Sequence, residues 1–234
     1  LREAFEHSKL DHPNIVRFLD FGQASGCYFI VMEYLYGLSI DEMVREHGPL
    51  TEENLLFVGH QISKAVVYLE SRDLLHRDVK PSNVVVTRDG TVKLLDFGLS
   101  RKRTDVTLSL NDEFMGSPHT VSPEYIRGDD GMDSRTDVYS LGVTLYFAAA
   151  GCFPFDGNSA MDILQGHLHA TAAPLHEGPR PDLPLKLSRT IGQMLAREPA
   201  DRPGPQAALN AFRRMLHRRG DTTRVDATPL AVDD

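Results

Sequence analysis

The chain contains the segment His76-Arg77-Asp78-Val79-Lys80-Pro81-Ser82-Asn83, and its other features are best interpreted around this segment. Asp78 is a carboxylate that can accept a proton, Lys80 is a neighbouring cation, and Asn83 offers an amide oxygen. A second carboxylate opens the motif Asp96-Phe97-Gly98 further along the chain. Phosphoryl transfer needs positioning, charge and a metal ion more than covalent chemistry from the protein, and oxygen ligands suit Mg²⁺. The two segments therefore predict a site for phosphoryl transfer.

Both motifs, in this order, resemble the catalytic and metal-binding loops of protein kinases. The resemblance covers residues 1–218 and implies an α+β, protein-kinase-like bilobal fold with a truncated small lobe and a mostly helical large lobe. The lysine two residues after Asp78 implies the Ser/Thr branch, and the motifs are similar to those of eukaryotic-type kinases from bacteria. The alternative, that these are ordinary polar residues of a surface turn, is disfavoured because two motifs occur in the expected order.

The resemblance implies a division of roles among the catalytic residues, with ATP and Mg²⁺ as cofactors. Asp78 is expected to orient the substrate hydroxyl and accept its proton, and Lys80 to stabilise charge on the γ-phosphate. Asn83 and Asp96 are expected to hold Mg²⁺. Ser117 is expected to contact Asp78 and Lys80. The implied partner is a protein substrate that presents a Ser or Thr hydroxyl.

A nucleotide pocket is implied where the last strand of the small lobe meets the large lobe. Glu33-Tyr34-Leu35 resembles the hinge, whose backbone groups read the adenine edge. Met32 is expected at the back of this pocket, and Val85 is expected below the adenine, although Met32 could also be an ordinary core residue. The complete set of cofactor-binding candidates is Glu33, Leu35, Val85, Met32, Lys80 and Asp96.

Structural or regulatory roles are expected for a further set of residues: Glu3, His76, Arg77, Phe97, Gly98, Ser117, Glu124, Asp137 and Arg202. Ser122-Pro123-Glu124 resembles the closing motif of the kinase activation segment, and Glu124 is expected to form a buried ion pair with Arg202. Asp137 is expected to hold the backbone of the catalytic loop. Glu3 falls where the family pairs a glutamate with a strand lysine, but a solvated surface glutamate is an open alternative.

Arg77 suggests how the site is regulated. Kinases with an arginine before the catalytic aspartate are commonly controlled by a phosphorylated activation segment, whose phosphate pairs with that arginine. The candidate phosphorylation sites are Thr104, Thr107, Ser109 and, less favoured, Ser117. Alternatively, Asp112 and Glu113 already place negative charge in this segment and could pair with Arg77 directly.

Apolar periodicity and turn residues predict the elements around these motifs. Helices are predicted over residues 1–10, from the capping box Ser39-Ile40-Asp41-Glu42 to Gly48, from Thr51 through Leu69, from Thr136 into the apolar run Val138–Phe155, and over residues 186–197 and 205–218. Strands are predicted over residues 15–21, 28–34, 84–86 and 92–95. The run Val138–Phe155 is long enough to raise a membrane-spanning alternative, but its polar residues favour a helix in a protein core.

The order of these elements divides the chain into three parts. Residues 1–36 are expected to be the remnant of the small lobe, with its helix, its last two strands and the hinge. Residues 37–219 are expected to form the large lobe, and residues 220–234 a polar tail or linker.

Composition limits the partners and the cellular location. The formal net charge of the 234 residues is −8, which argues against nucleic acid or an anionic membrane as the main partner. Cys27 and Cys152 are far apart, and the sequence predicts a buried, reduced thiol at each. This cysteine usage suits a reducing cytosol, so a cytoplasmic location is expected, although a longer parent chain could be anchored in a membrane. No signal peptide opens the sequence, and its start within a helical pattern suggests a fragment.

One part of the family pattern is not found in the sequence. No Gly-x-Gly-x-x-Gly loop and no following strand lysine precede Glu3, so the chain by itself is expected to bind ATP weakly and to phosphorylate slowly. Two interpretations differ in class: part of an active enzyme, or a pseudokinase-like scaffold without phosphotransfer. The presence of Asp78, Asn83 and Asp96 together favours the enzyme, because a scaffold has no chemical need for all three.

Overall fold

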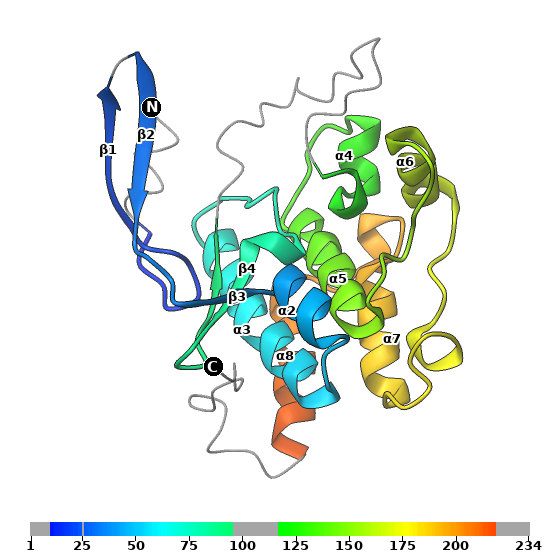
Figure 1. Cartoon of the computed structure of the whole chain (residues 1–234). Coiled ribbons are helices and arrows are strands. Elements are labelled where there is room, and N and C mark those ends of the chain that lie inside the picture. Colours follow the sequence, from blue (N-terminus) through cyan, green and yellow to red (C-terminus); the bar gives the residue numbers. More distant parts are fainter. Residues whose placement is uncertain (1–9, 25, 96–116, 219–234) are drawn as a thin grey trace.

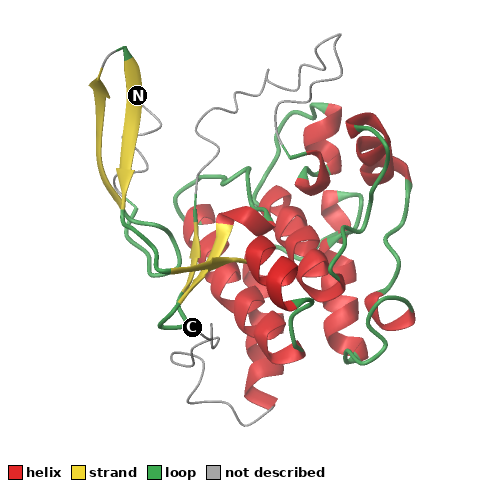
Figure 2. Cartoon of the chain, in the orientation of Figure 1, coloured by secondary structure: helices red, strands yellow, loops and turns green. Residues whose placement is uncertain are grey.

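The computed structural model describes residues 10–24, 26–95 and 117–218. In this part of the chain the helices form one body, a three-stranded sheet lies against it, and a two-stranded hairpin stands away from it (Figure 1). Colouring by secondary structure shows how much of the body is helical (Figure 2). The predicted α+β class with a mostly helical large lobe is therefore confirmed.

The elements follow one another in a simple order. The helices are α2 (Ile40–His47), α3 (Glu52–Glu70), α4 (Pro123–Arg127), α5 (Arg135–Ala150), α6 (Ala160–His169), α7 (Leu185–Met194) and α8 (Pro205–Arg218). The strands are β1 (Phe18–Ala24), β2 (Cys27–Met32), β3 (Gly37–Ser39), β4 (Val84–Thr87) and β5 (Val92–Leu94). Short 3₁₀ turns are η1 (Pro81–Asn83), η2 (Pro118–Thr120), η3 (Leu175–Glu177) and η4 (Pro199–Asp201).

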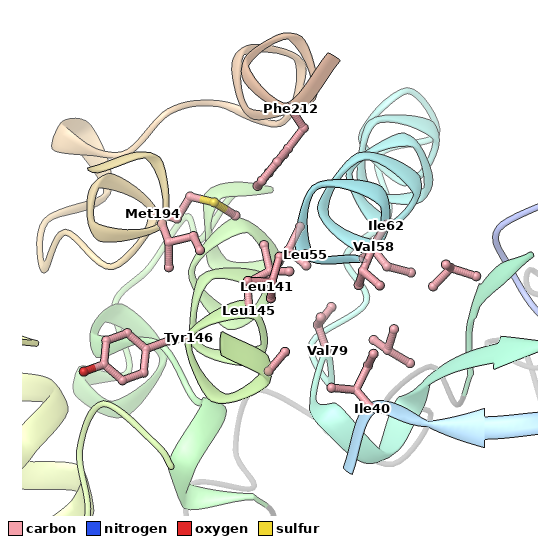
Figure 3. Close-up of a cluster of buried hydrophobic side chains, with 14 of the residues drawn as sticks. Ile40, Leu55, Val58, Ile62, Val79, Leu141, Leu145, Tyr146, Met194 and Phe212 are labelled. Carbon is pink, nitrogen blue, oxygen red and sulfur yellow. The ribbon is translucent and has the colours of Figure 1, made fainter. Parts of the chain in front are cut away.

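The core of the helical body lies where α3 packs against α5 and α8. Leu55 from α3, Leu141 from α5 and Phe212 from α8 meet there with at most 1% of their surface exposed (Figure 3). Burial of large apolar side chains is the main favourable term in folding. This core supports the segment between α3 and β4, which carries the candidate catalytic residues, because Val79 of that segment is itself fully buried in the cluster.

α5 resolves the alternative raised by the apolar run Val138–Phe155. The helix ends at Gly151, whose φ of 74° is the left-handed conformation that glycine adopts at helix ends. Its residues from Thr136 to Ala149 are all buried within the protein. In the ranges that the structure covers, no helix is both long and apolar enough to cross a membrane. The predicted core helix is confirmed.

The predicted capping box at the start of α2 is present. The Ser39 hydroxyl accepts the backbone N–H of Glu42, and the Glu42 carboxylate accepts the backbone N–H of Ser39. Gly48 ends the helix as predicted. The capping residue also belongs to β3, so the box fixes the point where the chain turns from the sheet into the helical body.

The three-stranded sheet has the order β3-β4-β5, and all its pairs are antiparallel. β4 and β5 form a hairpin where strands were predicted over residues 84–86 and 92–95, and Gly90 in its turn has a positive φ of 83°. β3 approaches β4 so closely that a Cβ on Gly37 would lie 2.0 Å from the carbonyl oxygen of Val86. The hairpin is buried on both faces along β4, which explains its continuous valine run.

The hairpin β1–β2 differs in detail from the prediction. β1 begins at Phe18 instead of residue 15 and continues to Ala24, past the predicted end at residue 21. The Phe29 ring packs over Gly22 across the hairpin, and a Cβ at Gly22 would come within 2.4 Å of it. Large apolar side chains are exposed along both strands, for example Tyr28 at 67%.

Both cysteines contradict the prediction of buried thiols. Cys27 and Cys152 are free and exposed. Cys27 lies at the start of β2 in the exposed hairpin, and Cys152 lies in the turn after α5. Residue type alone favoured burial for both, whereas their exposure depends on which elements pack beside them.

Helices α4 and α6 were not predicted. α4 spans only five residues, which is too short to show apolar periodicity, and it has Pro123 in its first turn. α6 begins with a capping box of Ser159 and Asp162 that was visible in the sequence. α7 starts at Leu185 and ends at Met194, shorter than the predicted range 186–197, while α8 begins and ends as predicted.

Several predicted features lie outside the described residues. They are the helix up to residue 9, Glu3, Asp96-Phe97-Gly98, the candidate phosphorylation sites Thr104, Thr107 and Ser109, the acidic residues Asp112 and Glu113, and the tail over residues 220–234.

Candidate active site

Three of the predicted catalytic residues meet in the segment between α3 and β4. The Nζ atom of Lys80 lies 2.9 Å from Oδ2 of Asp78, and the amide nitrogen of Asn83 donates to the same oxygen at 2.9 Å. The Asn83 amide also donates to the backbone carbonyl of Asp78 at 3.0 Å. The Asp78 side chain is only 11% exposed and that of Lys80 24% exposed. A cation and an amide therefore fix the orientation of one partly buried carboxylate.

The backbone of this segment is held by Asp137 at the start of α5. Its two carboxylate oxygens accept the backbone N–H groups of His76 and Arg77, at 2.7 Å and 2.8 Å. Arg77 has a φ of 63°, a left-handed conformation that is costly for a residue with a side chain and is typically found at functional sites. The contact between Asp137 and the catalytic loop was expected from the family, and the structure supplies its geometry.

Burial strongly affects the ionisation of Asp137. Its side chain is 1% exposed, and burial raises the pKa of Asp137 to about 6, although the hydrogen bonds from His76 and Arg77 act in the opposite direction. Two N–H donors need two acceptors, and a carboxylate supplies both. The ionised form of Asp137 is therefore the form that holds the loop best.

The end of β5 is joined to the same loop. The backbone N–H of Leu95 donates to the carbonyl of Asn83 at 2.8 Å, and Nε2 of the buried His76 lies 2.9 Å from the carbonyl of Leu95. Asp96 itself lies outside the described residues, but it directly follows Leu95. The chain thus reaches Asp96 from a point that is hydrogen-bonded to Asn83, the other predicted metal ligand.

Glu124 and Arg202, which were expected to pair, form a bidentate ion pair in which both side chains are at most 4% exposed. Burial alone would raise the pKa of Glu124, but the hydrogen bonds from Arg202 outweigh it and hold the pKa below its usual value. Thr136 also donates to Glu124, at 2.6 Å, so α4 is fastened to the start of α5. Ser117 lies just before η2, and its predicted contact with the catalytic residues stays a prediction.

The side chains of the predicted adenine pocket lie in different surroundings. The carboxylate of Glu33 contacts Nζ of Lys93 on β5 and accepts the backbone N–H of Arg17. Met32 is 38% exposed among the described residues. The alternative that it is an ordinary core residue is therefore wrong. Leu35 is partly buried, and Val85 is 8% exposed on β4.

Sequence reasoning missed Lys93 and Thr136. Lys93 stands between Val92 and Leu94, which are both fully buried, and strand alternation places its side chain on the opposite face. The one available signal for a partner of Lys93 was its position as a lysine inside an otherwise apolar strand. Thr136 was noticed only as the start of a helix, and nothing in its spacing indicated Glu124 as a partner.

Residues 1–212 match the family model described as the protein kinase domain. The chain belongs to the protein kinase family. The kinase domain is 36% identical over 202 residues to the serine/threonine-protein kinase PrkC of Bacillus subtilis, an alignment that covers 86% of this chain and 31% of PrkC. It is 35% identical to the serine/threonine-protein kinase pkn3 of Myxococcus xanthus, covering 97% of this chain and 43% of that relative.

A solved structure supports the same assignment. The kinase domain resembles the crystal structure of Rad53 1-466 in complex with AMP-PNP, with a TM-score of 0.76 and 30% identity, over 90% of this chain and 53% of the chain in that structure. The chain spans about a third of the length of PrkC. The fold of a protein kinase is therefore shown, and its relatives include serine/threonine kinases of bacteria.

Proposed function

We propose that this chain is the catalytic domain of a serine/threonine protein kinase that transfers the γ-phosphoryl group of ATP to Ser or Thr hydroxyls of a protein. The observation that carries the proposal is the arrangement around Asp78, whose Oδ2 is held at 2.9 Å by both Lys80 and Asn83. Asp78 orients the substrate hydroxyl and accepts its proton, and Lys80 places positive charge beside the transferred group.

The donor set of the site fits Mg²⁺. Because the amide nitrogen of Asn83 donates to Asp78, the atom of Asn83 that can ligate a cation is its oxygen. Asp96 supplies the second oxygen ligand, and hard oxygen donors are those that Mg²⁺ prefers. The ion would neutralise charge on the phosphates, while Asn83 keeps Asp78 in place.

Adenine contacts the hinge backbone in this proposal. The N–H of Glu33 donates to the carbonyl of Arg17 at 2.9 Å, so the contact of Glu33 with adenine is made by its own carbonyl. Leu35 supplies the neighbouring N–H, Val85 lies below the ring, and Met32 borders the pocket. We further propose a cytoplasmic location, since free exposed thiols at Cys27 and Cys152 are typical of a reducing compartment.

The direct test uses the protein at its natural length with radiolabelled ATP, Mg²⁺ and a mixture of basic and acidic protein substrates. We expect label on Ser and Thr, and a loss of at least about a hundredfold in Asp78→Asn, because a general base contributes on the order of 10²–10⁴ in rate. Asp41→Asn, at the start of α2, is the matched control. Equal labelling by Asp78→Asn removes Asp78 from the reaction.

The alternative function has a different outcome in the same experiment. A scaffold would bind protein partners without transferring phosphate, so the unaltered protein would give no label above the Asp78→Asn background. A nucleotide titration with and without Mg²⁺ then separates a nucleotide-binding scaffold from a chain that does not bind nucleotide.

A further inference from the structure

The side chain of Glu33 is used within the protein. Its Oε1 accepts a hydrogen bond from Nζ of Lys93 at 2.5 Å and another from the backbone N–H of Arg17 at 2.7 Å. The backbone N–H of Glu33 returns a hydrogen bond to the carbonyl of Arg17. One residue of the hinge is therefore fixed to the start of the hairpin β1–β2 and to β5 at the same time.

Lys93 lies on the strand that leads into the metal-binding motif. It pairs with Val85 across the hairpin, and only Leu94 and Leu95 separate it from Asp96. The neighbouring Leu94 exchanges backbone hydrogen bonds with Asn14 and Val16 at 2.9 Å each. β5 is thus flanked by β4 on one side and by residues 14–16 on the other, which makes it a rigid support for Lys93.

The contact is less exposed to solvent than an ordinary surface ion pair. The side chains of Lys93 and Glu33 are only 17% and 28% exposed. Burial alone would raise the pKa of Glu33, but the hydrogen bonds from Lys93 and Arg17 lower it below its usual value. Charge-assisted hydrogen bonds of this kind are shorter and stronger than neutral ones.

We propose that Glu33 and Lys93 are positioning residues that hold the adenine-reading backbone of the hinge in its binding geometry. This inference rests on the proposed function, because it assigns a role in nucleotide binding. The pair restricts residues 33–35 before the nucleotide arrives, so the bound nucleotide does not have to order this backbone. Preorganisation of this kind increases affinity by lowering the cost of binding.

The test measures the binding of adenosine and of ADP to the natural-length protein by calorimetric titration. Glu33→Gln and Lys93→Met should each weaken both ligands by the same factor, about three- to tenfold, the size expected for one charge-assisted hydrogen bond that is partly screened. Adenosine has no phosphate, so an equal effect on both ligands places the cause at the hinge. Lys93→Arg keeps the charge and should retain most of the affinity.

Matched controls and a reversed pair make the test specific. Glu46→Gln on α2 and Lys186→Met on α7 remove exposed charges elsewhere and should leave both affinities unchanged. The exchange Glu33→Lys with Lys93→Glu should recover part of the affinity lost in either single reversal. The midpoint of urea unfolding is recorded for every variant, so that a change in nucleotide affinity is distinguished from loss of fold.

The possible outcomes separate the role of the pair from the proposed function. Unchanged adenosine affinity in Glu33→Gln and Lys93→Met, or a loss confined to ADP, overturns the role of the pair. Nucleotide binding without phosphotransfer overturns the proposed enzyme and leaves the pair standing. No binding of either ligand by the unaltered protein overturns both.

Discussion

Glu124 and Arg202 lie 78 residues apart in the sequence and form two parallel hydrogen bonds in the core, at 2.6 Å and 2.7 Å. Arg202 also donates to the backbone carbonyls of Ala196 and Arg197, and its guanidinium lies 4.7 Å from the centre of the Tyr139 ring. The pair therefore joins α4 to the segment before α8 across the face of α5. The pair contributes to the free energy of unfolding only while both partners are present, because an unpaired buried charge is costly.

Arg202→Met should lower the free energy of unfolding by about 3–5 kcal/mol, because it leaves Glu124 buried without its counter-charge. Urea unfolding followed by circular dichroism measures this loss. The double variant Glu124→Gln with Arg202→Met should be less destabilised than Arg202→Met alone, since the unpaired charge is gone. Arg127→Met removes one partner of the exposed pair with Glu198 and should cost less than about 1 kcal/mol. Equal losses at Arg127 and Arg202 would contradict the argument.

Asp137→Asn should separate catalysis from stability. An amide has one acceptor oxygen where the carboxylate has two, so one of the N–H groups of His76 and Arg77 loses its partner. Displacement of a catalytic loop by about 1 Å can cost on the order of a hundredfold in rate, and we expect a loss of this order in phosphotransfer. The free energy of unfolding at neutral pH should change by less than about 1 kcal/mol, because removal of a buried charge offsets the lost hydrogen bond.

Rate assays and urea unfolding on the same preparation of Asp137→Asn check both halves of this prediction. Because burial raises the pKa of Asp137 to about 6, the unaltered protein should also lose phosphotransfer activity as pH falls through that value. An unchanged rate in Asp137→Asn would show that the loop holds its geometry without the second acceptor.

His167 should make the fold sensitive to acid. Its ring accepts or donates a hydrogen bond at 2.6 Å with the Tyr139 hydroxyl, and burial lowers its pKa from 6.5 to about 4. Between these values the unfolded chain binds a proton that the folded protein excludes. The stability that His167 contributes is therefore complete above about pH 6.5 and is lost as pH falls through about 4. The loss should be on the order of 3 kcal/mol.

Urea unfolding from pH 7 to pH 4 tests this prediction by comparison of three proteins. His167→Gln keeps an acceptor for Tyr139 but cannot be protonated in this range, so its stability should fall less steeply than that of the unaltered protein. His169→Gln, at an exposed position on the same helix, should follow the unaltered protein. Because burial also lowers the pKa of His12 to about 4, some acid sensitivity should remain in His167→Gln. Parallel curves for all three proteins would exclude His167 as the source.

The catalytic segment could be predicted because its information is local. Asp78, Lys80 and Asn83 lie within six residues, and a 3₁₀ turn is enough to bring them together. The capping box of Ser39 and Glu42 is local in the same way. Such features depend on spacing along one stretch of chain, which the sequence displays directly.

The unpredicted features depend on segments far apart in the sequence. The sequence predicted a role only for the backbone of Glu33, in reading adenine. Its carboxylate contacts Lys93 because residues 14–16, which precede the hinge, pack along β5. The exposure of Cys27 depends on what covers the hairpin β1–β2, which residue type does not indicate. Side-chain partners over such separations are set by tertiary packing, and the spacing of residues in a single sequence carries no signal for them.

Gly59 and Gly192 should respond in opposite directions to the same substitution. A Cβ at Gly59 on α3 would lie 2.6 Å from the Phe212 ring, because α3 and α8 approach closely there, whereas a Cβ at Gly192 on α7 would meet nothing within 4 Å. Alanine is favoured over glycine in helices by about 1 kcal/mol, so Gly192→Ala should stabilise by up to that amount. Gly59→Ala should destabilise by about 1–3 kcal/mol, because overpacking of a rigid core outweighs helix propensity. Urea unfolding of both variants gives the two signs, and stabilisation by Gly59→Ala would mean that Phe212 can move aside without cost.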